Sequence, residues 1–150
     1  MDNVIGLVTA LVSSFGFSLL FNQSRQHWLF AALGGALCWG TFLLVRHLLG
    51  GIFLATMFAG ALTVLYSELM ARVKKTPASH YLIVGLIPLV PGGSLYYCMS
   101  YAIQGELDKA RMYGGEAAQY ALGIAVGISL TWALMEMVKR ILQLKKEKKA

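Results

Sequence analysis

Residues that favour turns lie inside an apolar stretch that runs from Pro77 to Gln104 without an Asp, Glu, Lys or Arg; they are Pro88, Pro91, Gly92, Gly93 and Ser94. Proline has no N–H, so a helix must break here, and the carbonyls of Val84 and Ile87 lose their usual donors. Glycine permits backbone angles that other residues avoid. Unpaired backbone groups are costly in hydrocarbon, so such a break persists only within protein or beside water.

The polarity of this break favours a small zwitterion or carboxylate. The helix that begins near Ser94 offers unpaired N–H groups and the positive end of a dipole, which suit a carboxylate. The helix before it ends with the carbonyls of Val84 to Ile87, which suit an ammonium group or a cation. Discontinuous helices of this kind occur at the substrate sites of secondary transporters. The sequence therefore predicts substrate binding at Pro88, Pro91, Gly92, Gly93 and Ser94, with a purely structural kink as the alternative.

A polar face follows the break at helical spacing. Its members at i, i+4, i+7, i+8 and i+11 are Gly93, Tyr97, Ser100, Tyr101 and Gln104. We expect Tyr97 and Tyr101 to contact substrate, and Ser100 and Gln104 to line the route beyond it.

Two further faces carry small or hydroxyl residues. Thr56, Thr63 and Ser67 follow one face of an earlier apolar segment and are predicted to line a pathway, with helix packing as the alternative. Glu68, beside them, is a candidate for proton coupling, although it is also placed to pair with Arg72 at i+4. The Gly123-x-x-x-Gly127 pattern favours close helix packing.

Composition identifies the class of protein that must position these residues. The 150 residues are 57% hydrophobic and 13% charged, whereas a soluble domain carries about 25% charged residues. Apolar runs of about 18 residues or more indicate membrane spans. We predict an all-α integral membrane protein, forming a single transmembrane domain over residues 1–150.

The chain divides into five predicted spans. They cover about 3–21, 28–45, 48–67, 77–104 and 117–138. The fourth span is broken in its middle at Pro88–Gly93. A mixed-charge loop (106–111) precedes the fifth span, and a basic cytoplasmic tail (139–150) follows it. Of the 13 Lys and Arg residues, Arg46, Lys109 and Arg111 alone fall outside when the N-terminus is placed outside. The positive-inside rule therefore predicts an external N-terminus and a cytoplasmic C-terminus.

The sequence argues against several other classes of function. It contains none of the common hydrolase, metalloprotease or phosphate-loop motifs, so we expect neither an enzyme nor a cofactor. Cys38 and Cys98 are isolated within spans, so no metal site is predicted. The net charge of +6 comes from residues at span ends, which favours membrane topology over nucleic-acid binding.

The segment Ile87-Pro88-Leu89-Val90-Pro91-Gly92-Gly93, with Tyr96 and Tyr97 after it and Pro77 before it, resembles the signature of the threonine/serine exporter family. The resemblance is to the C-terminal half, which in the split form of the family is a separate small subunit. It implies a bacterial inner-membrane exporter that is driven by the proton gradient and assembled with a larger membrane subunit carrying the N-terminal half.

Several alternatives remain open at this stage. Some split members resemble exporters of succinate-like dicarboxylates, so the substrate is threonine, serine or a related small carboxylate. A non-transporting assembly or scaffold subunit would also contain a kink. A higher homo-oligomer that forms a channel predicts passive flux without the larger subunit.

Overall fold

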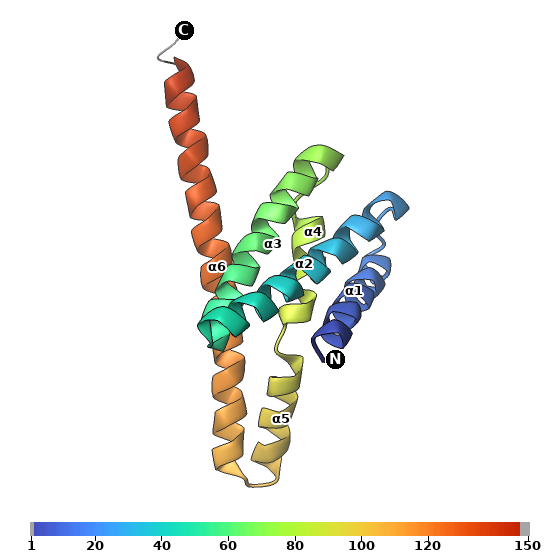
Figure 1. Ribbon diagram of the computed structural model, residues 1–150, viewed down its shortest axis with the longest axis vertical. Coiled ribbons are helices and arrows are strands. Elements are labelled where there is room, and N and C mark those ends of the chain that lie inside the picture. The colour runs from blue at the N-terminus through green and yellow to red at the C-terminus, as the bar shows by residue number, and fades with distance from the viewer. Residues whose placement is uncertain (1, 148–150) are drawn as a thin grey trace.

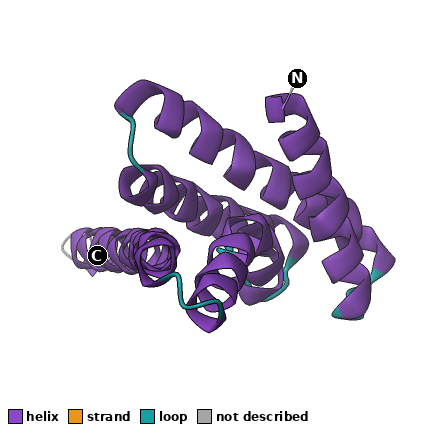
Figure 2. Ribbon diagram, turned by 90° about the horizontal axis from the view of Figure 1, so that it is seen from below, coloured by secondary structure: helices purple, strands orange, loops and turns teal. Residues whose placement is uncertain are grey.

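The computed structural model describes residues 2–147, and within this range the chain is helical apart from short connections (Figure 2). The elements are α1 (Asp2–Leu20), α2 (Arg25–Leu49), α3 (Ile52–Lys74), α4 (Ser79–Leu86), the short 3-10 helix η1 (Ile87–Leu89), α5 (Gly92–Ile103) and α6 (Leu107–Glu147). No strand occurs between residues 2 and 147, and the predicted all-α class is confirmed.

The structure confirms part of the predicted set of membrane spans. By length and apolar composition, three helical segments of the described chain are able to cross a bilayer: α2, α3 and residues Leu107–Ile141 of α6. The number of candidate spans rises to four if the bent pair Ser79–Leu89 and Gly92–Ile103 is counted as one span. The apolar helix Val4–Leu20, within α1, is shorter than these segments. Five crossings are therefore not confirmed.

The predicted break in the fourth apolar segment is confirmed. The helix tightens into η1 at Ile87, and Val90 is extended, with φ −62° and ψ 125°. The following helix, α5, begins at Gly92, and its axis is bent by 47° from that of the preceding pair. Pro88 lies at the start of η1, where a missing N–H costs least, and Pro91 immediately precedes α5.

The predicted mixed-charge loop at residues 106–111 is wrong, because most of it is helix. Gly105, with φ +77°, makes the sharp turn after α5, and α6 begins at Leu107. Lys109 pairs with Glu106 at 2.5 Å across the first turn. The fifth predicted span, 117–138, is therefore the middle of a helix of 41 residues, about 60 Å long. The predicted tail is helical up to Glu147, and its last residues, 148–150, lie outside the described part.

Small residues bring the helices into close contact. A central apolar cluster joins α2, α3 and η1, and its buried members are Cys38, Phe42, Ala55, Ala59 and Leu89. On α6, Gly123 lies against Thr56 and the Phe53 carbonyl, and Gly127 lies against the backbone of α3 from Met57 to Ala61. These contacts confirm the predicted packing role of Gly123 and Gly127.

The break lies closer to one end of the bundle than the sequence suggests. Gly85 lies beside Thr63, which is near the middle of α3. Leu89 packs with Ala55 and Ala59, in the first turns of α3. Figure 1 shows the consequence: α5 and the start of α6 extend as a hairpin past the turn between α2 and α3. The break is therefore in the middle of its segment but not in the middle of the helical bundle.

Candidate functional site

The turn between η1 and α5 leaves N–H groups without partners. The Val90 N–H donates to the Ile87 carbonyl at 3.1 Å, and the Gly92 N–H donates to the Val90 carbonyl at 2.8 Å. Among the described residues, the N–H groups of Gly93 and Ser94 have no backbone acceptor, and no side chain caps α5. Because these groups sit at the positive end of α5, they form a natural position for an anionic oxygen.

The two glycines of the turn are open on their outer side. A Cβ atom at Gly92 or Gly93 would meet nothing within 4 Å. Neither residue has a positive φ, because Val90 is extended and Pro91, with φ −78° and ψ 52°, makes an inverse γ-turn. The expectation that these glycines supply unusual angles is therefore wrong. Within this chain, neither backbone strain nor crowding requires glycine at these two positions.

The predicted row of unpaired carbonyls before the break is only partly present. The Val84 carbonyl accepts a hydrogen bond from Ser14 Oγ of α1 at 3.2 Å, and the Ile87 carbonyl accepts one from Val90. Both Ser14 and Ser18, four residues later, are fully buried. The sequence reasoning missed Ser14, although two serines at i and i+4 in an apolar helix mark a polar face. The predicted cation site at Val84 to Ile87 loses two of its acceptors in this way.

The predicted polar face of α5 is present and turns towards α6. The Tyr97 and Tyr101 rings stack at 6.4 Å, and the Tyr113 ring of α6 lies 5.3 Å from Tyr97 and 5.6 Å from Tyr101. Gln104 Nε2 donates to Ser100 Oγ at 3.0 Å. No residue of α5 is fully buried. These side chains therefore form a continuous polar surface that leads away from the turn.

The opposite side of α5 is apolar and exposed. Its largest side chains there, Tyr96, Met99 and Ile103, are 68%, 66% and 86% exposed. This surface is available to lipid or to another protein.

The three hydroxyl residues of α3 lie inside helix contacts. Thr56, Thr63 and Ser67 are buried. Each hydroxyl donates to a carbonyl of its own helix, at 2.9 Å for Thr56 and 2.7 Å for the other two. Thr56 lies against Gly123 of α6 and Thr63 lies against Gly85 of α4, whereas Gly92 and Gly93 at the break face open space.

Glu68 is separate from the break. It lies two and a half turns beyond Ala59, which corresponds to about 14 Å along the helix. Its side chain is 26% exposed, and Arg72 approaches it at 3.9 Å, as the i+4 spacing predicts. The structure therefore gathers the turn and the α5 face into one site and leaves Glu68 near the other end of α3.

A family model matches most of the chain. The family model described as Threonine/Serine exporter, ThrE, matches residues 6–134, which includes every predicted site residue. No curated protein and no solved structure matches the chain.

Proposed function

The chain belongs to the threonine/serine exporter family, and from this premise we propose that it is the small subunit of a two-component exporter. A larger membrane subunit supplies the other half of the pathway. The substrate is threonine, serine or a related small carboxylate, and the proton gradient drives export. The chain lies in a bacterial inner membrane with its N-terminus outside and its C-terminus in the cytoplasm.

The observation that carries this proposal is the uncapped start of α5. The Gly93 and Ser94 N–H groups have no acceptor within the described chain, and both glycines face open space. Lipid cannot satisfy these N–H groups, so a polar substrate, water or a partner must approach them. Glycine at both positions lets that group come close to the backbone.

The proposed roles follow from the geometry of the turn and of α5. Pro88 and Pro91 shape the break, while Gly92, Gly93 and Ser94 hold the substrate carboxylate. Tyr97 and Tyr101 contact substrate, and Ser100 and Gln104 line the route beyond them.

The proposed roles on α3 are less direct. Thr56, Thr63 and Ser67 support the inner wall of the pathway from within the packed bundle, and Glu68 is the proposed proton-coupling group. Because Glu68 lies far from the turn along the helix, proton transfer and substrate binding occur at separate places.

The proposal is tested by export from cells that express this chain together with a larger membrane subunit that carries the N-terminal half of the exporter. Cells loaded with labelled L-threonine are expected to export it only when both subunits are present. Gly92→Val and Gly93→Val should each lower export about tenfold or more, since each blocks a charge-assisted hydrogen bond. Gly115→Val is the matched control, because Gly115 also faces open space but lies on α6.

Each alternative predicts a different result. If both turn variants export normally, the site assignment is wrong. If export continues with this chain alone, the two-component proposal is wrong. Export of succinate in place of threonine identifies a dicarboxylate exporter. If the larger subunit exports threonine without this chain, this chain is a non-transporting scaffold.

A further inference from the structure

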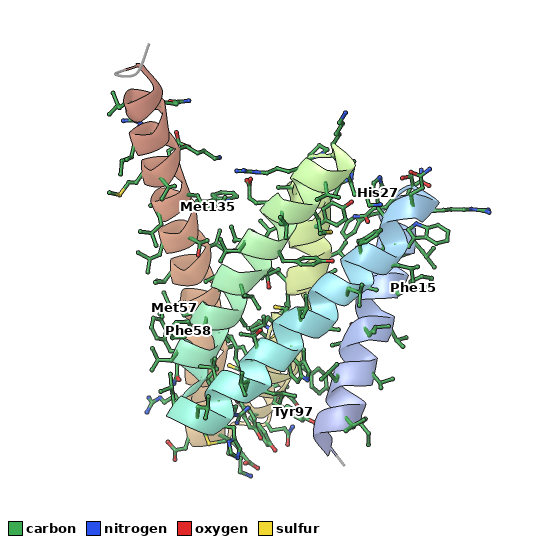
Figure 3. The ribbon with its side chains drawn as sticks, turned by 45° about the horizontal axis from the view of Figure 1, so that its top comes forward. Phe15, His27, Met57, Phe58, Tyr97 and Met135 are labelled. Carbon is green, nitrogen blue, oxygen red and sulfur yellow. The ribbon has the colours of Figure 1, made fainter. Side chains whose placement is uncertain are left out.

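A cavity lies at the opposite end of the bundle from the α5 turn. It has a volume of about 180 Å³ and is lined by Phe21, Gln23, Ser79, His80, Ile83 and Val84. These residues come from the connection between α1 and α2 and from the start of α4. Figure 3 shows His27, at this end, far from Tyr97 on α5.

Gln23 borders this cavity and carries an unsatisfied acceptor. The residue is 8% exposed, and its Nε2 donates to the His80 carbonyl at 2.7 Å. Its main-chain carbonyl accepts from Trp28 Nε1 at 2.7 Å. The side-chain oxygen Oε1 is buried and has no hydrogen-bond partner among residues 2–147. Since a buried unpaired acceptor is destabilising, Oε1 favours a hydrogen bond from a donor that enters the cavity.

The start of α4 offers hydrogen-bond donors. Ala78 precedes this helix, and its side chain cannot cap it. The N–H groups of His80, Tyr81 and Leu82 are used by the Pro77 and Ala78 carbonyls. In the part of the chain that the structure describes, the Ser79 N–H has no backbone acceptor, and its hydroxyl makes no hydrogen bond within the chain. An anionic oxygen is favoured beside these two donors.

Buried contacts hold the cavity walls in place. Tyr81 is completely buried, and its hydroxyl lies 2.6 Å from His27 Nδ1. Ser14 ties α1 to the Val84 carbonyl on the cavity wall. The site is therefore formed by this chain alone, before any ligand binds.

We propose that this cavity binds a small molecule that carries both an ammonium group and a carboxylate. The ammonium N–H donates to Gln23 Oε1, and the carboxylate lies at the start of α4 beside Ser79. Phe21, Ile83 and Val84 contact the methyl group of a short side chain. The choice of L-threonine as the ligand rests on the proposed export function.

Two substitutions at Gln23 separate ligand binding from structural support. Gln23→Met and Gln23→Glu both remove the N–H that binds the His80 carbonyl. Only glutamate keeps an oxygen that accepts a hydrogen bond from an ammonium group. Gln26→Met is the matched control, because Gln26 is exposed in the first turn of α2 and does not border the cavity.

The test is titration of the full chain, in lipid nanodiscs, with L-threonine and with 3-hydroxybutanoate, which lacks the amino group. Wild type and Gln26→Met are expected to bind L-threonine equally. Gln23→Met should bind it about tenfold more weakly, the loss of one buried hydrogen bond, and Gln23→Glu should stay near wild type. Wild type should bind 3-hydroxybutanoate more weakly than it binds L-threonine. Gln23→Met should bind 3-hydroxybutanoate as tightly as wild type does.

The proposal is overturned if wild type binds no L-threonine, if Gln23→Met binds it normally, or if both Gln23 variants weaken equally. Equal weakening assigns the whole effect to the lost His80 contact. If cells with both subunits export threonine while the purified chain binds none, the cavity proposal fails and the export proposal stands. If the chain binds L-threonine as described but cells export none, the export proposal fails and the cavity proposal stands.

Discussion

Gly127→Ala should weaken the contact between α3 and α6, because a methyl group at this position has no space. The new Cβ would overlap the Met57 carbonyl oxygen and would lie 3.1 Å from Met57 C and 3.2 Å from Ala61 N. All three are backbone atoms of α3, so no side chain is able to move aside. The helices must separate by about 1 Å to restore ordinary contact distances.

The magnitude follows from two opposing effects. Overpacking of this kind costs about 1–3 kcal/mol. Replacing glycine by alanine within a helix contributes about 0.5–1 kcal/mol in the other direction. The expected net loss is therefore about 0–2.5 kcal/mol relative to wild type, and about 1–3 kcal/mol relative to a helical Gly→Ala substitution in open space.

The measurement is unfolding of the purified chain by SDS in mixed micelles, followed by circular dichroism. Gly115→Ala is the control, because a Cβ atom at Gly115 meets nothing within 4 Å on the same helix. This control should be as stable as wild type or slightly more stable. If Gly127→Ala unfolds at the same SDS fraction as Gly115→Ala, the close approach of α3 and α6 is wrong.

Three further substitutions test other contacts. Ser14→Ala removes the hydrogen bond to the Val84 carbonyl and should lower the free energy of unfolding by about 0.6 kcal/mol, measured in the same SDS titration; no change would mean that this bond is absent. Tyr81→Phe removes the hydroxyl that meets His27 and should cost about 1 kcal/mol by thermal unfolding, and a stability equal to that of wild type would contradict a buried bond. Tyr113→Ala removes two ring contacts to α5, worth about 1–3 kcal/mol together, and should speed hydrogen exchange in α5 but not in α3. If α5 exchanges at the same rate in this variant as in wild type, the tyrosines do not hold the hairpin.

The break itself was predictable from the sequence, but its position in the bundle was not. Pro88 and Pro91 remove backbone donors wherever the segment lies, so local chemistry alone ends the helix. The depth of the break in the bundle depends on which residues of α3 face α4. The contacts of Gly85 with Thr63 and of Leu89 with Ala55 set that register, and the apolar pattern of either segment is compatible with several registers.

The charged stretch before the last span shows a different reason for error. Glu106 to Arg111 contains four charged residues, which on composition alone suggest a loop. Yet most of these residues have good helix propensity, and Gly105 supplies the turn that a loop would otherwise provide. The helix therefore starts at Leu107, and stacking on Tyr113 holds α5 against it. A contact between two neighbouring helices decided the outcome, and hydropathy does not record such contacts.

The fourth apolar segment contains two uncapped helix starts, at Ser79 and at Gly92. They are separated by the 11 residues of α4 and η1, or about 16 Å. Both starts direct the positive end of a helix dipole towards the same end of the bundle, because α4 and α5 run in the same general direction along the chain (Figure 1). A carboxylate leaving the Ser79 end thus meets a second favourable position at the Gly93 and Ser94 N–H groups. If the two positions act in sequence, blocking Gly92 should leave L-threonine binding at the Gln23 cavity intact while export is lost. Loss of both together would mean that the two ends form a single site.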